Sequence, residues 1–212
     1  DDIVLTLDAD VQKAAEKALG NNRGAVVVLD PRDGAVLALA SGPTFAPGSV
    51  ERDWNDLSKN PSAPLVNRAT GSTYPPGSTF KVVTLTEAIA DDVASPDSMW
   101  SGPSSMKIGG GKVTNFESSG YGKISLTRAT ANSVNTVFGQ LAVKIGAPRL
   151  VRRADAFGFD SKTPFELPVT KSFMTPASQM SEWELAWAGI GQPVKGGDIE
   201  PGEKIGPSVT PL

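Results

Sequence analysis

Tyr74-Pro-Pro-Gly-Ser-Thr-Phe-Lys-Val-Val-Thr-Leu-Thr-Glu-Ala-Ile-Ala90 is the most informative stretch of the chain. Its first part is rich in Pro and Gly, which is typical of a turn, and its second part repeats apolar residues at helical spacing. We therefore predict a helix that begins near Ser78 and runs to about Ala90. Residues three positions apart lie on one face of a helix, so Ser78 and Lys81 are expected to project side by side.

The Ser-x-x-Lys spacing indicates a chemistry because the 212-residue chain contains no histidine. A serine hydroxyl is a poor nucleophile until an adjacent base takes its proton. Without an imidazole, that base must be a lysine amine or a carboxylate, and Lys81 lies within reach of Ser78. A lysine can serve only if burial or neighbouring cations lower its pKa. The first hypothesis is a serine acyl-transfer enzyme with a lysine base.

Composition excludes several other classes of protein. The length fits one domain over residues 1–212, and 39% hydrophobic residues are enough for a core. The net charge of -3 predicts no nucleic-acid partner. The absence of cysteine excludes disulfides and cysteine nucleophiles, and without Cys or His we expect no transition metal and no cofactor. No apolar run approaches the ~18 residues that span a bilayer, and the chain opens on two aspartates, so we expect a soluble domain or part of a larger protein.

The apolar pattern along the chain predicts a mixed α/β (α+β) fold. Asp8 is expected to cap a helix that ends near Leu19. Pro31-Arg-Asp-Gly34 separates two β-rich runs and predicts an antiparallel hairpin over 24–40, covered on both faces. The other predicted elements are a strand at 3–7, an ordered excursion across the surface at 42–76, a short hairpin around Gly109-Gly-Gly111, a helix over about 126–144 capped by Ser125, a helix over 148–157, and a helix opened by the capping box Ser181-Glu-Trp-Glu184.

Ser133-Val-Asn135 is the second chemical signal. It lies in the predicted helix at 126–144, where a hydroxyl could pass protons and a carboxamide could hold a substrate amide. Alone, Ser-x-Asn is common, and both side chains could simply be bonded to backbone or solvent. Together with an upstream Ser-x-x-Lys, the motif becomes specific.

In this combination the chain resembles the transpeptidase domain of penicillin-binding proteins, and most closely the class B type of actinobacteria. The resemblance covers nearly the whole chain, from Asp1 onward. Further matching segments follow in the family's order: the hairpin at 24–40, Asn67-Arg68, Asn115-Phe-Glu117, Gly189-Ile-Gly-Gln192 and Val209-Thr-Pro-Leu212. It implies a serine β-lactamase/transpeptidase-like fold, a mainly antiparallel sheet flanked by helices, with a helical lobe that carries Ser133 and Asn135.

The resemblance also implies roles for four residues. Ser78 would attack the penultimate D-Ala carbonyl of a peptidoglycan stem peptide, Lys81 would accept its proton, Ser133 would relay the proton, and Asn135 would bind the substrate amide. The implied partners are peptidoglycan stem peptides, β-lactam antibiotics and cell-wall synthesis or division proteins. The implied location is extracytoplasmic, on the cell-wall side of a membrane-anchored parent protein, with no membrane contact by this chain.

One departure from the family pattern keeps other classes open. The family's Lys-Thr-Gly strand, which follows Val-Thr-Pro-Leu, does not occur, and Lys195-Gly196-Gly197 is only a superficial echo of it. The chain then corresponds to about the first two-thirds of such a domain, with impaired activity. The alternatives are a non-catalytic scaffold fragment and a β-lactamase or penicillin-sensor domain, although no clear deacylating glutamate follows Ser133.

Overall fold

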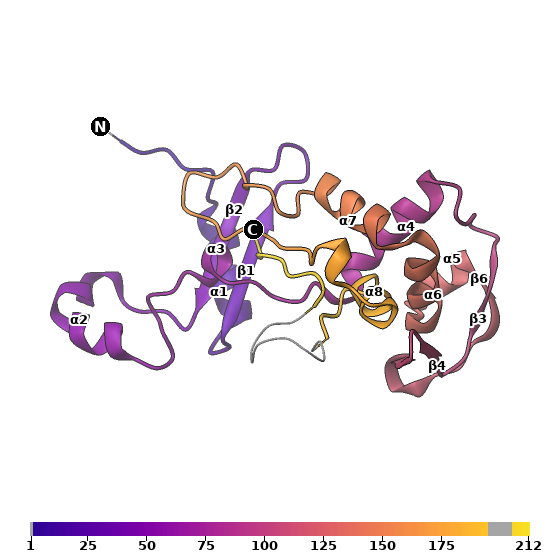
Figure 1. Cartoon of the computed structure of the whole chain (residues 1–212). Helices are drawn as coiled ribbons and strands as arrows, with labels where there is room; N and C mark the ends of the chain where they lie inside the picture. Colours follow the sequence, from indigo (N-terminus) through magenta and orange to yellow (C-terminus); the bar gives the residue numbers. More distant parts are fainter. Residues whose placement is uncertain (1, 195–204) are drawn as a thin grey trace. The chain divides into compact units, whose positions relative to one another are not determined.

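The structure is a computed structural model and describes residues 2–194 and 205–212. The chain divides into two compact units (Figure 1). Unit 1 comprises residues 1–74, 163–170 and 210–212, and unit 2 comprises residues 75–162 and 171–209. The segment Lys195-Gly196-Gly197, considered above as an echo of Lys-Thr-Gly, lies outside the described residues.

Unit 1 is built on a helix packed against a β-hairpin. Helix α1 (Ala9–Leu19) begins where Asp8 accepts hydrogen bonds from the backbone N–H groups of Asp10 and Val11, as predicted. Strands β1 (Gly24–Leu29) and β2 (Val36–Gly42) pair antiparallel, which confirms the predicted hairpin. The unit's small apolar core joins residues of α1 and β2: Ala15, Leu19, Ala38 and Ala40.

Two expectations for unit 1 are wrong. Residues 3–7 do not form a strand, because no chain pairs with them in the described residues, and Ile3 and Val4 remain 86% and 93% exposed. Strand β2 alternates between buried and half-buried residues, so the hairpin is not fully covered on both faces. The segment 42–76, expected to be an ordered excursion, contains η1 (Pro47–Ser49), α2 (Val50–Lys59), which has no buried residue, and α3 (Arg68–Gly71).

Unit 2 is mainly helical and carries two further antiparallel strand pairs. Strand β4 (Ser105–Ile108) pairs with β5 (Gly111–Thr114), which confirms the predicted short hairpin, and β3 (Met99–Gly102) pairs with β6 (Gly122–Ser125). The described strands thus form three two-stranded ladders rather than one sheet. The helices of unit 2 are η2 (Gly77–Phe80), α4 (Lys81–Ala90), η3 (Phe116–Ser118), α5 (Leu126–Ala131), α6 (Asn135–Ile145), α7 (Ala147–Ala156), η4 (Ala177–Gln179) and α8 (Glu182–Ala188).

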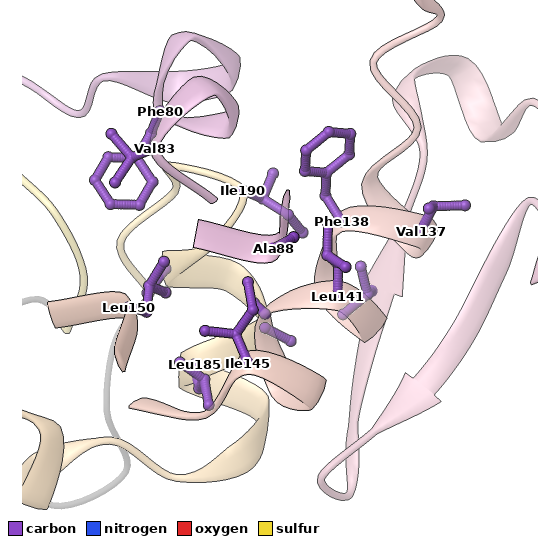
Figure 2. Close-up of a cluster of buried hydrophobic side chains, with 14 of the residues drawn as sticks. Phe80, Val83, Ala88, Val137, Phe138, Leu141, Ile145, Leu150, Leu185 and Ile190 are labelled. Carbon is purple, nitrogen blue, oxygen red and sulfur yellow. The ribbon is translucent and has the colours of Figure 1, made fainter. Parts of the chain in front are cut away.

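The core of unit 2 lies where four helices meet. Figure 2 shows apolar side chains of α4, α6, α7 and α8 converging, with Phe138, Leu141 and Leu150 fully buried among them. Ser125 caps α5, and Ser181 with Glu184 forms the predicted capping box of α8. Burial of these large side chains, each contributing roughly 1.5–3 kcal/mol, fixes the helices that carry the motifs. Among the described residues, no helix has both the length and the apolar character needed to cross a membrane.

A backbone contact between two glycines holds the start of the Ser78 helix. The N–H of Gly77 donates to the carbonyl of Gly191, in the turn after α8, at 2.9 Å. A Cβ atom at Gly191 would lie 1.9 Å from the Gly77 carbonyl oxygen, and Gly191 has φ +85°. Only glycine, which has no Cβ atom, allows the two turns to approach so closely, so the contact between them is made by backbone atoms alone.

We predict that Gly191→Ala destabilises the protein by at least twice as much as Gly158→Ala. Gly158 has a similar φ of +94°, but a Cβ atom added there would meet no heavy atom within 4 Å. The control therefore carries only the left-handed strain of about 1 kcal/mol, whereas Gly191→Ala adds a clash with the Gly77 carbonyl. Urea unfolding of both variants measures the difference, and equal midpoints would contradict the close packing at Gly77.

Candidate active site

Ser78 lies on the turn that opens the first helix of unit 2. Residues Gly77–Phe80 form the 3₁₀-helix η2, which continues directly into α4 at Lys81. The predicted helix is present, with a tighter first turn than expected. The Ser78 side chain is exposed, while Phe80 beside it is buried and anchors the turn in the core. The nucleophile candidate is thus presented to solvent by a fixed backbone.

Lys81 points inward and joins the two motifs. Only 5% of the residue is exposed. Its ammonium Nζ donates to the backbone carbonyl of Ser133 at 2.7 Å, to Ser133 Oγ at 2.8 Å and to Asn135 Oδ1 at 2.7 Å. Nζ also lies 5.3 Å from the centre of the Phe138 ring. The structure therefore brings Lys81, Ser133 and Asn135 into direct contact, although Lys81 is 52 and 54 positions away from the other two in the chain.

Burial changes the acid–base character of Lys81. Removal of its ammonium from water lowers its pKa from 10.5 to about 8. Its hydrogen-bond partners in the described part of the chain are all neutral, so no carboxylate offsets that loss of hydration. A pKa near 8 makes a neutral amine accessible close to physiological pH, as a general base requires.

Ser133 interrupts the helix predicted over 126–144. It has φ +52°, a left-handed conformation that is unfavourable for a residue with a side chain. The N–H of Ser133 donates to the Thr130 carbonyl and that of Val134 to the Ala129 carbonyl, which is the Schellman pattern of a helix end. Glycine is usual at this position, so a serine here carries local strain of about 1 kcal/mol. The single predicted helix is therefore two, α5 and α6, and the Ser133 hydroxyl stands at the break.

Asn135 is the first residue of α6, and the side chain of a second asparagine, the buried Asn115, stabilises the start of that helix. Asn135 Nδ2 donates to the Thr114 carbonyl at 2.9 Å, while its oxygen accepts from Lys81. The N-cap residue of α6 is Val134, whose side chain cannot cap a helix. Asn115 instead accepts from the N–H of Thr136 at 2.9 Å from across the fold.

The four candidate residues adjoin one pocket within unit 2. Ser78, Ser133 and Asn135 line it, with Lys81 behind them, and its volume is about 640 Å³. The sequence interpretation did not place several other lining residues there: Thr114, Phe116, Glu117, Tyr121 and Gln192. Trp187 packs against the core and lines the pocket as well. Phe116, Glu117 and Gln192 belong to segments that match the family pattern, but the sequence does not place any of these residues beside Ser78, because they reach the pocket only through tertiary packing.

Metal ligands are not part of this arrangement. Over residues 2–194 and 205–212, no group of three or more His, Cys, Asp or Glu side chains is placed to hold a metal ion. The polar groups nearest the two motifs are the hydroxyls of Ser78 and Ser133, the Asn135 amide and the buried Lys81 amine. Such a set suits proton transfer and acyl transfer.

Comparison with known proteins shows the family of this chain. The model of the penicillin binding protein transpeptidase domain matches residues 24–199. The chain belongs to this family. As a penicillin-binding protein transpeptidase domain it is similar to the peptidoglycan D,D-transpeptidase MrdA of Escherichia coli K12, with 35% identity over 86% of this chain and 30% of that protein. It is likewise 35% identical to the peptidoglycan D,D-transpeptidase PbpA of Mycobacterium tuberculosis H37Rv, over 88% of this chain and 41% of that protein.

Solved structures confirm the mixed α/β transpeptidase fold. The D,D-transpeptidase domain of a peptidoglycan glycosyltransferase from Eggerthella lenta superposes with a TM-score of 0.90 and 46% identity, over 99% of this chain and 51% of that one. Penicillin-binding protein A from M. tuberculosis, as an imipenem acyl-enzyme complex, superposes with a TM-score of 0.81 and 32% identity, over 97% and 48%. The class B resemblance is confirmed, and the chain spans between 30% and 51% of the length of these relatives.

We predict that Ser133→Gly is more stable than Ser133→Ala by about 1 kcal/mol. Both variants lose the hydroxyl that accepts from Lys81, so their difference isolates the left-handed backbone, which glycine adopts without strain. Chemical denaturation of the two variants measures it. If the alanine variant is as stable as the glycine variant, Ser133 does not hold the left-handed conformation in solution.

Proposed function

We propose that this chain carries the acyl-enzyme chemistry of a peptidoglycan D,D-transpeptidase, acting on stem peptides that end in D-Ala-D-Ala. The observation that supports this most directly is the contact of the buried Lys81 amine with Ser133 and Asn135, one helical turn from Ser78. It supplies a base of suitable pKa next to a serine in a chain without histidine. The relatives named as peptidoglycan D,D-transpeptidases support the substrate class.

In the proposed reaction, neutral Lys81 takes the hydroxyl proton of Ser78 as Ser78 Oγ attacks the carbonyl of the penultimate D-Ala. The bond from Oγ to that carbon forms and the C–N bond to the terminal D-Ala breaks. The proton passes through Ser133 Oγ to the leaving amine. An amine of a second stem peptide then attacks the acyl carbon, the bond from Ser78 Oγ to that carbon breaks, and one proton of the amine returns to Oγ, which completes the cross-link. Serine remains unchanged after each cycle.

Two further groups have assigned roles in this proposal. The backbone N–H of Ser78 lies in the first turn of a helix, where N–H groups lack intrahelical partners and the dipole favours negative charge, so it would stabilise the oxyanion. The second N–H of the Asn135 amide, beyond the one bound to Thr114, would hold the substrate backbone. Residue roles for Ser78, Lys81, Ser133 and Asn135 are thus part of the proposal.

β-Lactams are expected to acylate the same serine, because an imipenem acyl-enzyme is known for the similar penicillin-binding protein A. Ring opening by Ser78 Oγ would transfer the hydroxyl proton to the lactam nitrogen. We further propose that the domain acts on the cell-wall side of the membrane, where stem peptides lie, alongside other cell-wall synthesis or division proteins. A scaffold without catalytic activity would form no adduct, and a β-lactamase would release it rapidly.

The function is tested by mapping the adduct. We predict that prolonged incubation with penicillin G adds one molecule to the intact protein, located on the peptide that contains Ser78. Ser78→Ala should abolish the adduct, whereas Ser58→Ala, a serine on the exposed helix α2, should not. A persistent adduct at any other residue would overturn the assignment, and its absence would favour the scaffold alternative.

The rate of adduct formation should rise with pH. The neutral form of Lys81 is the active base, and a group with a pKa of about 8 is roughly one-tenth neutral at pH 7, so the rate should increase about tenfold to a plateau above about pH 9. Lys81→Met should remove both the reaction and this dependence, while Lys123→Met, an exposed lysine of β6, should retain both. Mass spectrometry with Ser78→Ala as background measures the profile. A flat profile would exclude Lys81 as the base.

A further inference from the structure

The loop between β5 and β6 forms one wall of the pocket beside Ser78. Asn115, Phe116, Glu117 and Ser119 of this loop all line the pocket, together with Ser133 and Asn135. All of these residues belong to unit 2. The loop is therefore placed to contact whatever occupies the site, and the reaction proposed above assigns it no role.

The loop is held in a strained but well-supported conformation. Glu117 and Ser118 have φ +50° and +55°, two successive left-handed residues that are not glycine. Asn115 is buried, and its amide donates to the carbonyls of Pro103 at 2.9 Å and Ser119 at 2.8 Å. The N–H groups of Ser118 and Ser119 close the turn onto Asn115 and Phe116. Strain that the surroundings maintain in this way is typical of ligand-binding segments.

This conformation presents an apolar ring and a carboxylate at the pocket. The Phe116 side chain is 81% exposed, although burial would stabilise a phenylalanine by roughly 1.5–3 kcal/mol. Glu117 is the one charged residue among those that line the pocket, and the described residues place no cation in ion-pair contact with it. Neither side chain contributes to the folded core, so both are available to a ligand.

We propose that Phe116 and Glu117 recognise a peptide side chain that ends in a primary amine on an aliphatic stem. The Phe116 ring would cover the methylene groups of the stem, and the Glu117 carboxylate would pair with the ammonium group. This inference rests on the proposed function, and it defines the substrate class of the same site more narrowly: stem peptides that carry an uncapped diamino-acid side chain bind in preference to those whose amine is blocked.

Two peptides that differ only in that amine test the inference. The probes are Nα-acetyl-L-Lys-D-Ala-D-Ala and its Nε-acetylated counterpart, titrated into the 212-residue protein and followed by NMR chemical shifts. The free amine should bind about fivefold more tightly at low salt, the upper range for an exposed ion pair, and the preference should shrink as salt is added. Equal affinities of the wild-type protein for the two peptides would overturn the inference.

Variants assign the preference to the two side chains. Glu117→Gln should reduce the affinity ratio to about 1, and Phe116→Ala should weaken binding of both peptides. Glu182→Gln, a matched exposed carboxylate at the start of α8 outside the pocket, should keep the ratio. If Glu117→Gln does not fold, Glu117→Asn removes the same charge with a residue that tolerates φ +50°. A ratio retained in a folded Glu117 variant would overturn the assignment.

Failure of this inference is distinguishable from failure of the proposed function. Penicillin G has no ammonium group, so its adduct at Ser78 reports the acyl-enzyme chemistry independently of amine recognition. An adduct at Ser78 without an amine preference rejects the role of Phe116 and Glu117 and leaves the proposed function in place. An amine preference without an adduct supports recognition by this loop and rejects the acyl-enzyme proposal.

Discussion

The buried ammonium of Lys81 is the constraint on which the site depends. A desolvated cation is tolerated only where its N–H groups are satisfied, and here three oxygen atoms of Ser133 and Asn135 accept from it. This requirement ties the start of α4 to the start of α6. It also holds two polar motifs at a fixed separation within an otherwise apolar core. The same burial lowers the pKa of Lys81 to about 8, as the base role that we propose for it requires.

Backbone strain is concentrated around this contact. Of six non-glycine residues with positive φ in the described chain, two line the pocket, Glu117 and Ser133, and a third, Ser118, follows Glu117 in the same turn. At Ser133, glycine would end α5 with less strain, but it would carry no hydroxyl for Lys81. The backbone at this position is therefore less stable than it would be with glycine, but the pocket has a hydroxyl group that glycine would not supply. This pattern is typical of sites in which chemistry, rather than folding, selects the residue.

Asn115 connects the two parts of the pocket to which we assign catalysis and recognition. One side chain caps α6, which carries Asn135, and braces the turn that presents Phe116 and Glu117. Because Val134 cannot cap α6 itself, the helix start depends on this distant amide. A movement of the loop at 115–119 would therefore be transmitted through the hydrogen bonds of Asn115 to the start of α6, and from there to the contact of Lys81 with Asn135.

Features that arise from neighbouring residues could be predicted from the sequence alone. Asp8, Ser125 and the box at Ser181–Glu184 predicted helix starts, Asp33-Gly34 predicted the first hairpin, and the motif around Ser78 predicted the family. These signals are local, since a cap or a turn is satisfied within a few residues.

The remaining features depend on tertiary contacts. The residues at 3–7 alternate as a strand does, but a strand requires a partner chain, and the described residues supply none. The break at Ser133 overrides a helical pattern because Lys81, 52 positions away, bonds its carbonyl and hydroxyl. The Gly77–Gly191 approach, the Asn115 cap and the pocket wall at Phe116 and Glu117 likewise join segments distant in sequence. Local propensity carries no information about such contacts, because their energy exists only once the core has brought the segments together.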